Sequence, residues 1–177
     1  MPNSTYLDMA LLALLFLASA FDLAQRRIPN RLLLVGLLAA AGLQLALAGP
    51  LALLSVCLAG FVLGLLMFLP LYLAGAMAAG DVKLMATVGA FAGPALVLQI
   101  CLATYCVGGV MALVIVLVLG RARAAFTNVA AVMRPILMRL RGIPLVDEPL
   151  PLPSVGGMPY ALAISLGSLL VLWLQRG

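Results

Sequence analysis

Residues 51–83 read LALLSVCLAGFVLGLLMFLPLYLAGAMAAGDVK, and this stretch decides the fold. Its first part, residues 51–73, carries no charge, and a helix needs about 20 such apolar residues to cross the hydrocarbon core of a bilayer. A run of small residues, 74–80, follows it, and Asp81 and Lys83 open the next long apolar stretch. The segment therefore predicts a membrane-spanning helix, a turn at one membrane face, and charged residues at the start of the next span.

The whole chain has the same character, because 66% of its 177 residues are hydrophobic, 8% are charged, and the mean hydropathy is +1.28. A soluble domain is nearer a quarter charged. We therefore predict an all-α polytopic membrane protein that forms a single membrane-embedded domain over residues 1–177. The six predicted spans are residues 7–23, 32–48, 51–73, two spans within 81–119, and 158–174.

The division between the fourth and fifth spans is the least obvious boundary. Gly93-Pro94 punctuates the sequence, but a turn there would leave the fourth span too short to cross a bilayer. We therefore place the boundary near Leu98-Gln99.

The basic residues set the topology, because positive charge accumulates on the cytoplasmic side of membrane proteins. Arginines follow the first span, which predicts an N-terminus outside. With that orientation, the arginines of the cytoplasmic segments are Arg26, Arg27, Arg31, Arg121, Arg123, Arg134, Arg139 and Arg141. Only Arg176 falls outside. The net charge of +5 is thus a sign of topology and not of nucleic-acid binding. Asp22 and Asp81 both fall at the cytoplasmic face.

The predicted cytoplasmic loop, residues 120–157, begins with a segment that mixes arginines and apolar residues. Residues 120–141 are typical of an interfacial helix on anionic lipid, although a solvated positive loop is the alternative. Prolines and glycines in residues 142–157 indicate an irregular connector.

Asp22 and Asp81 are the only acidic residues between Met9 and Val146. An ionisable group in a membrane is costly, so each is a functional-site candidate. Structural roles remain open for both. Asp22 opposes the dipole of its own helix and gains nothing there as a cap, but it could pair with Arg26, four residues on. Asp81 could serve as the N-cap of its helix.

Two carboxylates held close together tend to share one proton, which is the division of labour of an aspartic protease. The chain has no histidine, so a Ser-His triad and an HExxH zinc site are both excluded. The three cysteines, at positions 57, 101 and 106, form no CxxC pair. We therefore expect no metal and no cofactor.

Three motifs occur in order along the chain: Asp22 before Arg27-Ile28-Pro29-Asn30, then Gly80-Asp81-Val82-Lys83-Leu84, then Gly157-Met158-Pro159-Tyr160-Ala161. In these motifs the chain resembles the type IV prepilin peptidases, the bacterial GxGD membrane aspartyl proteases. The resemblance implies that Asp22 and Asp81 are the catalytic pair and that Gly80 is the second motif glycine. We expect Pro29, Asn30 and Lys83, together with Ala78 and Gly80, to bind substrate or to support the motifs.

The sequence departs from that family at the first motif glycine, which is Ala78 here. An added methyl group costs little at negative φ, but at positive φ it would cost on the order of 1 kcal/mol. The chain has no paired CxxC motifs, so we expect it to lack the cysteine-rich N-terminal domain of the long family members. It is similar to the short branch associated with tight-adherence (Flp-type) pili, so we expect no methyltransferase activity.

The resemblance implies a substrate, a prepilin or pseudopilin cleaved between its basic cytoplasmic leader and its hydrophobic helix. It also implies a place in the bacterial inner membrane, with the active site near the cytoplasmic face and contact with the pilus assembly machinery. Two alternatives stay open. The protein could be a small transporter subunit with the acids as a proton or cation relay, or a catalytically inactive pilus-assembly scaffold.

Overall fold

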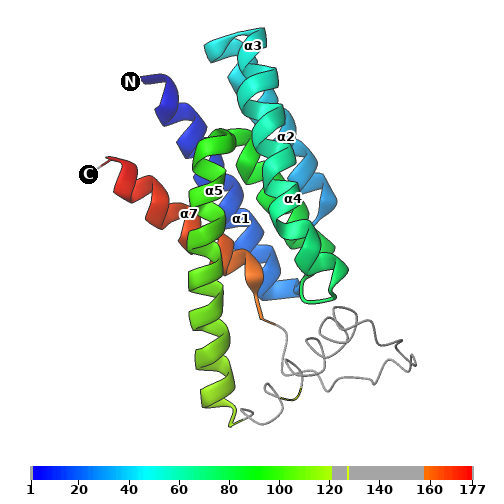
Figure 1. The fold of residues 1–177 in the computed structure, drawn as a ribbon. Coiled ribbons are helices and arrows are strands. Elements are labelled where there is room, and N and C mark those ends of the chain that lie inside the picture. The colour runs from blue at the N-terminus through cyan, green and yellow to red at the C-terminus, as the bar shows by residue number, and fades with distance from the viewer. Residues whose placement is uncertain (1, 121–126, 128–157, 177) are drawn as a thin grey trace, which may run out of the picture. The chain divides into compact units, whose positions relative to one another are not determined.

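The computed structural model describes residues 2–120, residue 127 and residues 158–176 (Figure 1). Regular structure within this part of the chain is helical, with no β-strand among the described residues. Four stretches are long and apolar enough to cross a membrane: Thr5–Gln25, Asn30–Ala48, Pro50–Leu73 and Ala79–Val118. The predicted class, an all-α polytopic membrane protein, agrees with this architecture. The predicted interfacial helix in residues 120–141 lies outside the described residues.

The helices follow the apolar runs closely. Their bounds are α1 Pro2–Gln25, α2 Asn30–Ala48, α3 Pro50–Ala52, η1 Leu53–Leu58, α4 Ala59–Leu73, α5 Ala79–Val118 and α7 Tyr160–Arg176. The elements α3, η1 and α4 form one uninterrupted helical stretch, in which η1 is a π-helical segment. Pro29 has the extended conformation of an N-cap, so α2 begins at Asn30, as Pro29-Asn30 predicted.

The chain divides into two compact units. The first unit contains residues Met1–Gly109 and Pro159–Gly177, and the second contains Val110–Met158. The first unit holds both aspartates and almost all of the described helices. In the second unit, the described residues are mainly the C-terminal part of α5.

Helix α5 breaks at Gly93, whose φ of 80° and ψ of 172° are not helical. The chain folds back at this residue. A Cβ on Gly89 would lie only 3.2 Å from the Val97 side chain, which is possible only after such a reversal. In a straight helix these two residues would be about 12 Å apart along the axis. Figure 1 shows the same reversal near the label of α5. Our predicted boundary near Leu98-Gln99 is therefore wrong, since both residues are helical.

The prediction failed because the minimum length for a membrane span applies to a helix that faces lipid. The first half of α5 is surrounded by protein, and of residues 81–93 all but Lys83 and Ala92 are buried. A helix that is covered on all sides does not have to match the hydrocarbon thickness. This short buried helix is the element that carries Asp81.

Helix α4 packs against the buried half of α5 through glycines. A Cβ on Gly60 would overlap the carbonyl group of Gly89, and one on Gly64 would lie 2.6 Å from the Met85 oxygen. Glycines spaced four residues apart allow two membrane helices to approach closely, as in small-residue packing motifs. The backbones of α4 and α5 are therefore in direct contact at these glycines.

The break in α5 is also stabilised by a buried side chain of α2. Gln44 is 4% exposed, and its Nε2 donates a hydrogen bond of 3.3 Å to the carbonyl oxygen of Phe91. The helix is interrupted at Gly93, so this carbonyl lies among the last ones of the buried half of α5. Gln44 gives it the partner that a buried polar group requires.

Candidate active site

Asp22 lies in the last turn of α1 and is 8% exposed. Its Oδ2 accepts a hydrogen bond of 3.0 Å from the backbone N–H of Ala161, at the start of α7. The first N–H groups of a helix have no partner inside the helix, and a carboxylate there is favoured. The prediction that Asp22 gains nothing as a cap considered only its own helix. The described residues show no ion pair with Arg26, and Asp22 caps α7 instead.

Two serines continue the polar contact between α1 and α7. The hydroxyl groups of Ser19 and Ser165 are 2.7 Å apart, and Ser19 also donates to the carbonyl oxygen of Ala161 at 3.4 Å. Ser165 contacts the carbonyl oxygen of Leu15 at 3.3 Å. Hydrogen bonds of this kind join helices in apolar surroundings. We call these residues with Asp22 and Ala161 the polar seam, and it fixes Asp22 relative to α7.

Asp81 lies in the first turn of α5 and is 7% exposed. Its backbone N–H donates to the carbonyl oxygen of Ala78 at 3.1 Å. The helix begins at Ala79, so Asp81 is its third residue and not its N-cap, contrary to that structural alternative. The position near the helix N-terminus still favours a carboxylate, because the helix dipole is positive there.

The two carboxyl groups lie on segments that pack against each other. Two contacts between the connector after α1 and the start of α5 bring them together. Ile28 packs beside Gly80, where an added Cβ would lie 3.6 Å from it, and Lys83 donates a 3.1 Å hydrogen bond to the Asn30 side chain. The first two sequence motifs are therefore in contact through their supporting residues.

Ala78 is compatible with this arrangement. Among the described residues other than glycine, only Arg26 has a positive φ, of 51°. Ala78 thus avoids the left-handed conformation in which a methyl group would be strained. Its side chain is exposed. Alanine therefore adds little strain to the backbone at this position, where the family that the chain resembles has glycine.

Sequence reasoning assigned no role to an aromatic cluster beside the acids. Phe68 is fully buried and stacks on Tyr105, with ring centroids 5.1 Å apart, and it meets Tyr160 edge-to-face at 6.2 Å. Gly64, four residues before Phe68, packs on Met85, four residues after Asp81, so the cluster lies beside the first turn of α5. The one available signal was the position of Tyr160 in the third motif.

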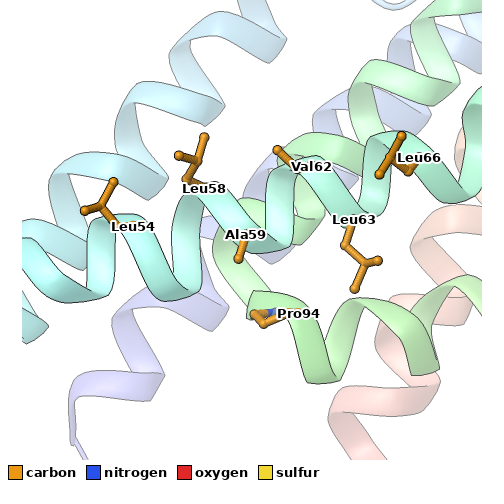
Figure 2. A pocket seen from close by; sticks show the side chains of 7 residues that line it. All are labelled: Leu54, Leu58, Ala59, Val62, Leu63, Leu66 and Pro94. Atoms are coloured by element: carbon orange, nitrogen blue, oxygen red, sulfur yellow. The ribbon is translucent and has the colours of Figure 1, made fainter.

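A groove of about 500 Å³ lies along η1 and α4, next to Pro94 of α5 (Figure 2). All its lining residues are apolar: Leu54, Leu58, Ala59, Val62, Leu63, Leu66 and Pro94. Ala59 and Leu63 point toward the segment that carries Pro94. Because the groove contains no group that could do chemistry, it is a surface for apolar contact and not part of the acid site.

Comparison with protein families decides the class of the molecule. Residues 9–113, more than half of the chain, match the model of the type IV leader peptidase family. The chain belongs to this family. It is therefore a multi-pass membrane peptidase of the prepilin peptidase type, and the matched region includes both buried aspartates. No curated protein and no solved structure matches the sequence.

Proposed function

We propose that this leader peptidase is an aspartyl endopeptidase whose catalytic pair is Asp22 and Asp81. One observation carries the proposal. In a chain that belongs to a peptidase family, two buried carboxyl groups from different helices lie on segments that are joined by the Lys83–Asn30 hydrogen bond. Ala78, Gly80, Pro29, Asn30 and Lys83 support the pair by shaping the contact between the α1–α2 connector and the start of α5.

The reaction follows the chemistry of a carboxylate pair that shares one proton. The ionised carboxylate accepts a proton from water while the water oxygen attacks the scissile carbonyl carbon. The protonated carboxyl group hydrogen-bonds the carbonyl oxygen. The tetrahedral intermediate then collapses, the C–N bond breaks, and the leaving nitrogen takes a proton from the pair. The proton belongs to the pair as a unit, so neither role is assigned to Asp22 or to Asp81 individually.

The proposed substrate is a prepilin or pseudopilin of the Flp type, cleaved between its basic leader and its hydrophobic helix. A carboxylate pair attracts the basic leader electrostatically. The proposed enzyme is a single membrane-embedded domain over residues 1–177 of the bacterial inner membrane. It has six spans, an N-terminus outside, and an active site near the cytoplasmic face. Arginines on that face contact anionic lipid, and the product passes to the pilus assembly machinery.

The test is co-expression with an Flp-type prepilin, comparing the wild type with Asp22→Asn and Asp81→Asn. Asparagine keeps the size of the side chain, and at position 22 it can still accept from Ala161 N–H, but it cannot exchange a proton. Both variants should leave the prepilin uncut in an immunoblot. Asp8→Asn is the matched control, because Asp8 is on the same helix as Asp22 but near its other end, and this variant should cleave normally.

The outcome separates the proposal from its alternatives. Cleavage by both asparagine variants would exclude the aspartyl mechanism. A wild-type protein that cuts no pilin-like substrate would favour the scaffold. A transporter relay requires acids near the bilayer midplane, whereas these two lie in the last turn of α1 and the first turn of α5.

A further inference from the structure

Tyr160 connects the two halves of the acid site through its backbone and its side chain. The next residue, Ala161, donates its backbone N–H to Asp22, so the main chain at this position is fixed to one acid. The Tyr160 ring packs on Phe68, and the antiparallel register of α4 and α5, with Gly60 on Gly89 and Gly64 on Met85, puts Phe68 at the level of the other acid, Asp81. A single residue at the start of α7 thus contacts the surroundings of both carboxyl groups.

The ring has one defined position. It packs edge-to-face on Phe68 at 74°, and Phe68 is fully buried and held on its other side by Tyr105. Space for the hydroxyl group exists because the neighbouring residue on α5 is Gly108. A Cβ at that position would lie 3.1 Å from the Tyr160 oxygen. The packing therefore keeps the hydroxyl beside α5.

The two tyrosines of the cluster differ in their hydroxyl groups. Tyr105 donates a 2.6 Å hydrogen bond to the carbonyl oxygen of Met67, so its hydroxyl joins α5 to α4. The Tyr160 hydroxyl has no hydrogen-bond partner among the described residues, although it is partly buried. A partly buried hydroxyl usually has a partner. For Tyr160 this donor remains available beside the acids.

We propose that Tyr160 is a positioning residue for the acid pair, with its O–H donating a hydrogen bond to the Asp81 carboxyl group when substrate fills the site. The inference rests on the proposed function. The hydroxyl fixes the direction of the Asp81 oxygens toward the scissile bond and gives up no proton. Its removal therefore slows the chemical step and leaves substrate binding unchanged.

The test compares Tyr160→Phe with Tyr105→Phe in purified enzyme acting on a prepilin. Each substitution removes one hydroxyl and keeps the ring. Loss of a hydrogen bond to one member of a carboxyl pair that carries a single charge is worth roughly tenfold in rate, so kcat of Tyr160→Phe should fall about tenfold. Its KM and thermal midpoint should stay at wild-type values. Tyr105→Phe should show the reverse, with a lower thermal midpoint and kcat within about twofold of the wild type.

Two results would overturn the inference. One is a wild-type kcat for Tyr160→Phe. The other is a fall in kcat accompanied by an equal loss of thermal stability, which indicates a packing role only. Asp81→Asn is measured in the same assay. If Asp81→Asn is active, the proposed function fails; if it is inactive while Tyr160→Phe is fully active, only the role of Tyr160 fails.

Discussion

The two aspartates are held by opposite kinds of packing. Asp22 lies in the polar seam, where side-chain and backbone hydrogen bonds join α1 to α7. Asp81 lies on a helix whose backbone packs directly on α4. Gly60 and Gly64 of α4 have no side chains, so the two backbones can touch. A single substitution in the polar seam removes only the hydrogen bonds of that side chain and leaves the others in place. The backbone contact between α4 and α5 has no room for even one added carbon, so a single substitution there should lower the stability far more.

The largest expected effect is from Gly60→Ala. The new methyl group would overlap the Gly89 carbonyl, and neither backbone can move away without displacing its helix. Overpacking of this kind costs about 3 kcal/mol or more. Gly42→Ala is the control, since a Cβ there meets nothing within 4 Å. Thermal unfolding in detergent should show a large drop for Gly60→Ala and none for Gly42→Ala. Equal midpoints for the two variants would remove the contrast between the two regions.

A medium effect is expected from Gln44→Leu. Leucine fills the same space but leaves the Phe91 carbonyl oxygen buried without a partner, which costs about 1–3 kcal/mol. The matched control is Gln99→Leu, because Gln99 is exposed and its bond is to Gln175, another exposed side chain. Chemical denaturation should separate the two variants. A Gln44→Leu protein as stable as Gln99→Leu would show that the break in α5 does not depend on α2.

The smallest expected effect belongs to the polar seam. Ser19→Ala and Ser165→Ala each remove one end of a 2.7 Å contact, and hydrogen bonds between membrane helices are worth about 0.6 kcal/mol on average. The double variant should therefore be only slightly less stable than either single variant, since the interaction is already lost. A coupling energy between Ser19 and Ser165 as large as the destabilisation by Gly60→Ala would mean that the polar seam tolerates substitution as poorly as the glycine contact.

Much of the fold could be predicted because most of its helices are consecutive apolar runs. The ends of α2 and of α4 fall at the predicted residues, 48 and 73, since Gly49-Pro50 and the small residues after Leu73 interrupt the helix locally. The turn at Gly93 was visible as Gly93-Pro94 but was rejected on a length argument. Only the burial of residues 81–93 explains why a short helix is allowed there, and burial depends on the other helices.

The candidate site was predictable in its residues but not in its contacts. Asp22 and Asp81 stand out because charge is rare in this chain. The hydrogen bond from Ala161 to Asp22 joins residues at opposite ends of the sequence, and no local pattern encodes it. The same holds for Tyr160, whose neighbours Phe68 and Gly108 come from two other helices. Local propensity specifies the helices, whereas their packing assembles the surroundings of the acids.

The break at Gly93 separates the position of Asp81 from the thickness of the bilayer. A helix that ends in lipid on both sides must tilt or shift when the membrane becomes thicker or thinner. The buried half of α5 ends against Val56 of η1 on one side and in the short turn after α4 on the other. Changes in lipid length act on the outer helices first. The buried half of α5 does not itself have to match the bilayer, so the depth of Asp81 follows α4, the helix against which it packs.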